Sequence, residues 1–126
     1  LEWIGDQCAN IAKRVKELNK EPALKPYIDL PRMAQAASNM VKEALDAFVR
    51  GDDALAIKVC GDDQVVDDLN EQIQRELLTF MMGDPSTITR AIKINHVSKC
   101  LERIADHATN VAEMVIFMVK GKDIRH

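Results

Sequence analysis

Apolar residues recur every three or four positions through most of this chain, and this spacing is what most constrains its fold. The spacing places apolar side chains along one face of a helix, and that face must be buried against other helices. The 126 residues include only five glycines and four prolines. No run alternates apolar and polar residues in the manner of a half-buried strand. The pattern therefore predicts an all-α protein.

Breaks in the apolar pattern divide the chain into four predicted helices. These helices cover about residues 1–20, 29–50, 53–82 and 86–120. Short loops between long helices force neighbouring helices to run antiparallel. The expected fold is an all-α, antiparallel three-helix bundle over 29–126. One extra amphipathic helix over 1–20 and a linker over 21–28 are expected to precede the bundle.

Glycines mark three expected boundaries or defects. Gly51 is expected to end the second helix and Gly121 the fourth, because glycine readily adopts the conformation that closes a helix. Gly61 is expected to interrupt and bend the third helix, and Asp62 beside it is interpreted as marking that bend. The predicted buried faces of the last three helices consist of Met33, Ala37, Met40, Ala44 and Ala47 or Phe48; of Leu55, Val59, Val66, Leu69, Ile73, Leu77 and Phe80; and of Val97, Leu101, Ile104, Ala108, Val111, Val115 and Met118.

The charge and the cysteine content exclude several classes of function. A formal net charge of −3 argues against nucleic acid as a main partner, because neutralisation of phosphate groups dominates that affinity. It argues equally against direct binding to an anionic membrane, and no apolar run approaches the ~20 residues of a membrane span. Cys8, Cys60 and Cys100 form neither a disulfide framework nor a thiol zinc site. This cysteine usage favours a reduced, cytoplasmic compartment.

The first predicted helix repeats part of the last one. Residues 1–12 align with residues 101–112, and six of the twelve positions are identical. Shared Leu, Ile and Ala are expected of any buried helix face, but shared Glu, Asp and Asn are not. An offset of 100 residues is typical of two copies of one bundle. Because Leu1 opens the chain with no capping residue ahead of it, residues 1–20 are predicted to be the last helix of a truncated first repeat.

Several segments together resemble the PhoU family of phosphate-transport regulators. The segments are LERIADHATNVAEM with the closing GKDIRH, FMMGDPSTITRA, and DLPRMAQAASNMVKEALDAFVRGD. The resemblance implies a cytoplasmic, non-enzymatic negative regulator of phosphate uptake and of the phosphate-starvation two-component response. It implies contacts with the ATPase of a phosphate ABC transporter and with a sensor histidine kinase. Association with the membrane would then occur only through these partners.

The resemblance also implies metal binding by E/D-x-x-x-D motifs. Two carboxylates four residues apart lie on one helix face and can bind a hard cation, and a second pair from a neighbouring helix can complete a site. The implied cofactor is a multinuclear transition-metal ion, with iron as the first choice and zinc, manganese or magnesium as alternatives. The matching residues are Asp63 and Asp67, Glu102 and Asp106, and, in the remnant of the first repeat, Glu2 and Asp6, with Asn10 and Asn110 as possible extensions of the polar stripe.

The helical wheel predicts where these carboxylates lie. At about 100° per residue, Glu102, Asp106 and Asn110 fall roughly opposite the predicted buried face of their helix. Asp63 and Asp67 fall about 80–120° from theirs. A metal would therefore sit at the surface, where two outer faces approach each other. The alternative interpretation of the same spacing is a solvated acidic face that binds no metal.

The competing function is a carboxylate-metal helical-bundle enzyme, either an oxidase or a hydrolase. A ferritin-like site needs Glu-x-x-His motifs that project into the core, and the sequence contains none. No arrangement of nucleophile, base and orienting group is recognisable either. Regulatory binding is therefore the preferred hypothesis. A homo-oligomer is expected, because the apolar face of helix 1–20 must be covered by the later helices or by a second chain.

Overall fold

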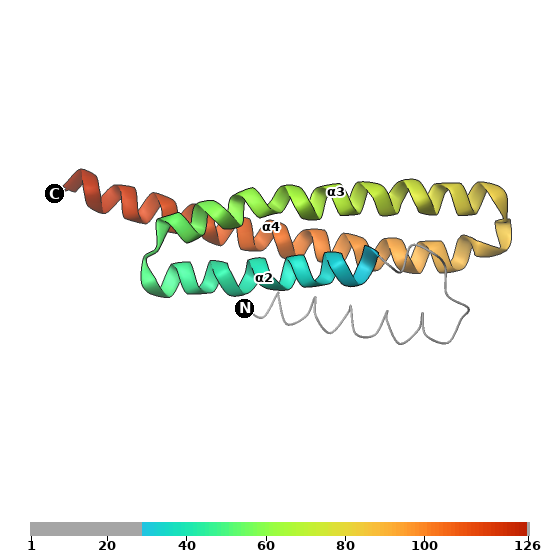
Figure 1. The fold of residues 1–126 in the computed structure, drawn as a ribbon, viewed down its shortest axis with the longest axis horizontal. Coiled ribbons are helices and arrows are strands. Elements are labelled where there is room, and N and C mark those ends of the chain that lie inside the picture. Colours follow the sequence, from blue (N-terminus) through green and yellow to red (C-terminus); the bar gives the residue numbers. More distant parts are fainter. Residues whose placement is uncertain (1–28, 126) are drawn as a thin grey trace.

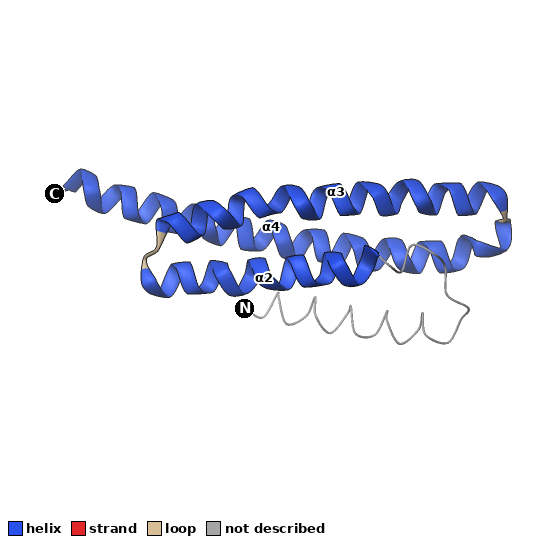
Figure 2. Cartoon of the chain, viewed as in Figure 1, coloured by secondary structure: helices blue, strands red, loops and turns tan. Residues whose placement is uncertain are grey.

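The computed structural model describes residues 29–125, and in this range the chain forms three long helices and one short turn of 3₁₀-helix. The elements are α2 (Asp29–Arg50), α3 (Asp53–Gly83), η2 (Pro85–Thr87) and α4 (Ile88–Arg125). The three long helices lie side by side, and each contacts the other two (Figure 1). Figure 2 shows only helix and short connections over the described residues. The predicted all-α class and the three-helix bundle are confirmed.

Two other sequence predictions fall outside this range. The extra helix over 1–20 and the linker over 21–28 lie outside the described residues. The division of the chain into repeats therefore stays a prediction. No helix in the described part of the chain is long and apolar enough to cross a bilayer.

Helix α2 is the most strongly amphipathic of the three helices. Its buried apolar residues follow the predicted spacing, and Ala47 is fully buried while Phe48 is 50% exposed. The helix ends before Gly51, which adopts a φ of 63°. That left-handed conformation is accessible to glycine at little cost, so the predicted boundary is confirmed. Asp52 then caps α3, its side chain accepting a hydrogen bond of 3.1 Å from the backbone N–H of Leu55.

Helix α3 runs without interruption through Gly61, so the predicted break there is wrong. One glycine in a helix interior costs only about 1 kcal/mol relative to alanine. The burial of Val59 and Val66 on either side stabilises the helix by more than that. Asp62 lies within this continuous helix. Its carboxylate lies 2.9 Å from the ammonium group of Lys58, which also pairs with Glu43 of α2 at 2.8 Å.

Helix α4 also differs from the prediction at its end. It continues past Gly121 to Arg125, so the stop predicted at Gly121 is wrong. Among the described helices, the last turns of α4 extend beyond the α2–α3 turn, past the ends of the other two (Figure 1). At its start, Asp84 caps the 3₁₀ turn by accepting a 3.0 Å hydrogen bond from the backbone N–H of Ser86.

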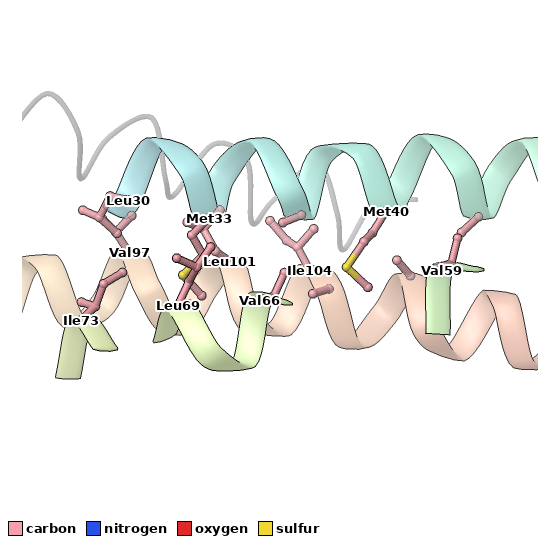
Figure 3. Close-up of a cluster of buried hydrophobic side chains, with 14 of the residues drawn as sticks. Leu30, Met33, Met40, Val59, Val66, Leu69, Ile73, Val97, Leu101 and Ile104 are labelled. Atoms are coloured by element: carbon pink, nitrogen blue, oxygen red, sulfur yellow. The ribbon is translucent and has the colours of Figure 1, made fainter. Parts of the chain in front are cut away.

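The core fills the space between the three helices, and Figure 3 shows its central part. The buried face of α4 is rotated from the prediction: Ala105 and Ala112 are fully buried, whereas Met118 is 50% exposed. Helix α4 contacts both α2 and α3, so it buries a wider face than a single line of residues. The fully buried larger apolar side chains are Met33, Met40, Val59, Val66, Ile73, Leu77 and Ile94.

The core makes a direct test of the fold possible. Ile73→Ala removes a side chain that is fully buried in α3, and we expect it to lower the free energy of unfolding by about 2–5 kcal/mol. Urea unfolding followed by far-UV circular dichroism measures this change. Leu78→Ala, in the same helix but at a side chain that is 56% exposed, is the matched control and should cost much less. Equal losses in the two variants would contradict the arrangement of the core.

Candidate functional site

The structure places the four predicted carboxylates of the second repeat on two helices that pack together. Asp63 and Asp67 lie on α3, and Glu102 and Asp106 lie on α4. Within each pair, the four-residue spacing puts both side chains on one face of a continuous helix. Helices α3 and α4 have the most extensive mutual contact in the bundle. We refer to these four residues as the carboxylate cluster.

The cluster lies at the edge of the α3–α4 interface. Asp63, Asp67 and Glu102 are half-buried, and only Asp106 is exposed. The prediction that the pair on α4 would lie opposite the buried face is therefore wrong for Glu102. Burial of Ala105 and Ala112 moves the centre of that face close to Leu101, about 100° from Glu102 along the helical wheel.

The acidic side chains act on one another electrostatically. Burial raises the pKa of Asp63 above its ordinary value, and the negative charges of Asp67, Asp106 and Glu102 raise it further. The pKa of Asp67 is also raised, first by burial and then by the charges of Glu102 and Asp68. Burial and the charge of Asp67 do the same to the pKa of Asp106. The predicted residues of the two helices are thus close enough to repel one another.

Asp63 also carries a polar atom without a partner. Its Oδ1 atom is buried and accepts no hydrogen bond. The nearby Thr109 hydroxyl lowers the pKa of Asp63 but does not cancel the effect of burial. A buried oxygen that lacks a donor costs about 1–3 kcal/mol, unless another group or an ion supplies the positive charge. Half-buried carboxylates with one orphaned oxygen are a donor set that suits a divalent cation.

The carboxylates are near one another without forming a closed set of ligands. In the described part of the chain, no three His, Cys, Asp or Glu side chains converge closely enough to hold a metal ion. The negative charges of the cluster repel one another, and this repulsion opposes closer approach of the carboxylates. Binding of a cation would therefore require the side chains to turn inward from the two helices.

Glu102 is held by two groups that the sequence analysis did not consider. The side-chain amide of Asn70 donates a hydrogen bond of 2.9 Å to Glu102 Oε2. The ammonium group of Lys99 lies 3.6 Å from the other oxygen, Oε1. A usable signal was present, because Asn70 follows Leu69 on the buried side of α3. A buried amide requires hydrogen-bond partners from a neighbouring helix.

Four further site residues were predicted from the sequence. Glu2, Asp6 and Asn10 lie outside the described residues. Asn110 is exposed and lines a surface pocket with Met114 and Phe117.

Repulsion within the cluster predicts a stabilising substitution. We expect Asp67→Asn to raise the free energy of unfolding of the metal-free protein by about 0.2–0.5 kcal/mol for each like-charge pair relieved. Thermal unfolding in the presence of a chelator measures this gain. Asp46→Asn, at an exposed carboxylate of α2, is the control that changes the net charge equally.

The gain should depend on pH in a defined direction. Because the pKa of Asp67 is raised in the folded protein, its ionised form destabilises the fold at neutral pH. As the pH falls through that raised pKa, Asp67 of the parent protein becomes protonated and the advantage of Asp67→Asn disappears. A gain that grows as the pH falls would contradict repulsion as its cause.

Comparison with known proteins places the whole chain in one family. A protein-family model described as "PhoU domain" matches residues 30–115. The "Phosphate-specific transport system accessory protein PhoU homolog" of Pseudomonas aeruginosa is 42% identical over 127 residues, which cover 100% of this chain and 52% of that protein. The corresponding "homolog 2" of Thermotoga maritima is 43% identical over 122 residues, which cover 97% of this chain and 52% of that protein.

A solved structure gives the same result for the fold. The crystal structure of PhoU from Pseudomonas aeruginosa matches with a TM-score of 0.89 at 40% sequence identity, covering 95% of this chain and 58% of that one. The chain spans about half the length of the curated relatives it matches. The match of the family model and the identity to these relatives confirm the resemblance found in the sequence. The chain belongs to the PhoU family.

Proposed function

We propose that this chain is a non-enzymatic regulatory part of a phosphate-transport system. The observation that carries the proposal is the identity of 42% over the whole chain to a protein named as an accessory protein of phosphate-specific transport. The finer part of the proposal is negative regulation of phosphate uptake and of the phosphate-starvation response. It would act from the cytoplasm, as a homo-oligomer, through contacts with a transporter ATPase and a sensor histidine kinase.

The packing of the described helices supports binding over catalysis. The buried polar residues in the described range are Asp29, Asn70, Thr87 and Ser98, set in an otherwise apolar core. A ferritin-like enzyme instead needs Glu and His ligands that project into the centre of its bundle. The carboxylate cluster lies at the edge of an interface, where an accessory protein can present it to a partner.

Metal binding by the carboxylate cluster is part of this proposal. Asp63 and Asp67 would supply oxygen ligands from α3, and Glu102 and Asp106 from α4. A metal ion, with iron first and zinc, manganese or magnesium as alternatives, would supply positive charge when bound. The orphaned Oδ1 of Asp63 and the mutual repulsion of the cluster support the proposal, because a cation relieves both.

The chain's own residues would convert cation binding into a structural effect. The two pairs stand on different helices, so ligands drawn inward from both would link α3 to α4. Repulsion across the interface would become attraction, and the exposed side of the cluster at Asp106 would lose negative charge. A partner that contacts this face would meet a surface of altered charge and reduced mobility.

Metal binding can be tested with a charge-matched pair of variants. We expect the protein to bind Fe²⁺ or Mn²⁺ in equilibrium dialysis followed by elemental analysis. The double variant Asp67→Ala/Asp106→Ala should lose that metal, because it removes one ligand from each helix. The control Asp46→Ala/Glu71→Ala removes the same charge from exposed positions outside the cluster and should retain it. Equal metal content in the two double variants would exclude the cluster as the site.

The regulatory role can be tested separately in the host cell. Deleting the gene should raise uptake of radiolabelled phosphate by cells grown with abundant phosphate, because a negative regulator is removed. Restoring the gene should lower uptake again. Uptake that is unchanged or reduced by the deletion would contradict negative regulation, whatever the metal experiment shows.

A further inference from the structure

A chain of hydrogen bonds leads from the core to the carboxylate cluster. Ser98 of α4 is fully buried, and its hydroxyl donates a hydrogen bond of 2.6 Å to Asn70 Oδ1 on α3. Asn70 is 7% exposed, and its Nδ2 donates the bond of 2.9 Å to Glu102 Oε2. This series of hydrogen bonds thus begins on α4, crosses to α3 and returns to α4 one turn further along. It ends on a residue of the cluster.

The neighbours of Asn70 fix the orientation of its amide. On one side, the Ser98 hydroxyl and, at 3.4 Å, Gln74 Nε2 both present hydrogens to Oδ1. On the other side, the Glu102 carboxylate can only accept, so it requires the NH₂ group. Turning the amide over would place two oxygens together at Glu102 and lose the bond from Gln74. One orientation therefore satisfies all the partners of Asn70.

This arrangement leaves the Oε1 atom of Glu102 available to a cation. Oε2 is tied to the half-buried side of the interface by Asn70. Oε1 points to Lys99, whose ammonium group lies 3.6 Å away and whose side chain is 46% exposed. A surface ion pair of this length contributes little energy, so Lys99 can move away when a stronger cation arrives. The amide hydrogen bond is shorter and part-buried, so we expect it to persist when a cation binds.

We propose that Asn70 is a positioning residue that holds the Glu102 carboxylate for cation binding between α3 and α4. This inference rests on the proposed metal binding by the cluster. Without Asn70, Glu102 has the rotational freedom of a long side chain at the edge of an interface, and repulsion from Asp67 drives it outward. Residues that orient metal ligands typically contribute about 10–100-fold to metal affinity.

A purely structural role for Asn70 makes a different prediction. Asn70, Gln74, Asn95 and Ser98 form a layer of hydrogen-bonded polar side chains between α3 and α4, which we call the polar layer. If Asn70 is only structural, loss of hydrogen bonds in this layer would change stability alone. Gln74 provides the comparison, because it belongs to the same layer and bonds to Asn95 Oδ1 at 2.6 Å. Gln74→Leu removes the long 3.4 Å bond to Asn70 Oδ1, while the 2.6 Å bond from Ser98 and the acceptor-only Glu102 carboxylate still hold the Asn70 amide in its orientation. Metal affinity separates the two roles, since a structural role predicts the same affinity for both variants.

The experiment measures Mn²⁺ binding by isothermal titration calorimetry, together with the electron paramagnetic resonance spectrum of bound Mn²⁺. We expect Asn70→Leu to bind Mn²⁺ at least about tenfold more weakly than the parent, with a changed spectrum. Gln74→Leu should keep the parent's affinity and spectrum. Asn70→Ser is the second variant, because its short hydroxyl cannot reach Glu102 but keeps the layer polar if Asn70→Leu fails to fold.

The outcomes separate this inference from the proposed function. If the parent binds Mn²⁺ and a folded Asn70 variant binds it equally well, the inference is wrong and the metal site stands. An equal loss of affinity in the Asn70 and Gln74 variants would also overturn it in favour of a structural role. If neither the parent nor any variant binds Mn²⁺, Fe²⁺ or Zn²⁺, the metal site itself is wrong and the inference falls with it.

Discussion

The packing of α3 against α4 is the interaction on which the rest of the structure depends. Side chains such as Val66, Ile73 and Ile94 are fully buried, and each contributes about 1.5–3 kcal/mol on leaving water. Like-charge pairs on the helix surface cost only about 0.2–0.5 kcal/mol each. The apolar faces therefore fix how α3 and α4 lie against each other, and this packing determines the positions of the carboxylates. Repulsion in the cluster is a consequence of packing and is too weak to oppose it.

The polar layer adds direction to this packing. Apolar side chains of similar size tolerate small shifts along the helix axes, because dispersion contacts have little directional preference. The hydrogen bonds among Ser98, Asn70 and Glu102 do not tolerate such shifts, since each depends on donor and acceptor geometry. The buried amide of Asn70 thus favours one register of α3 and α4 at the level of the carboxylate cluster.

Helical periodicity was sufficient to predict the three long helices of the described residues and most of their core. The spacing of Met33, Ala37 and Met40 identified the buried face of α2, and Gly51 its end. Gly61 and Gly121 were misread because glycine breaks a helix only where packing or solvation leaves the alternative favourable. Packing overrides it at Gly61, and at Gly121 α4 continues beyond the ends of the other two described helices (Figure 1). The preference of a single glycine acts locally, whereas tertiary packing determines whether the helix ends there.

The residues of the carboxylate cluster were predictable from the sequence, but the burial of their side chains was not. The spacing of Glu102 and Asp106 placed both on one face of α4, which is correct. Their relation to the core depended on which small residues of α4 are buried, and Ala105 could not be distinguished from a surface alanine by type. Because α4 packs against both α2 and α3, it buries a broad face, and the edge of this broad face includes Glu102.

The unequal burial of the cluster gives its members different parts in the proposed function. Glu102 is tied to the core through Asn70, so its position is set before any ion arrives, whereas the exposed Asp106 remains free to adapt. Preorganising one ligand lowers the entropy lost on binding, and adaptable ligands can then complete the coordination. Because Asp106 also faces solvent, the same ion that is anchored from the core would alter the charge that a partner meets. A cation at the edge of the α3–α4 interface would in this way connect the interior of the bundle with its solvent-exposed face.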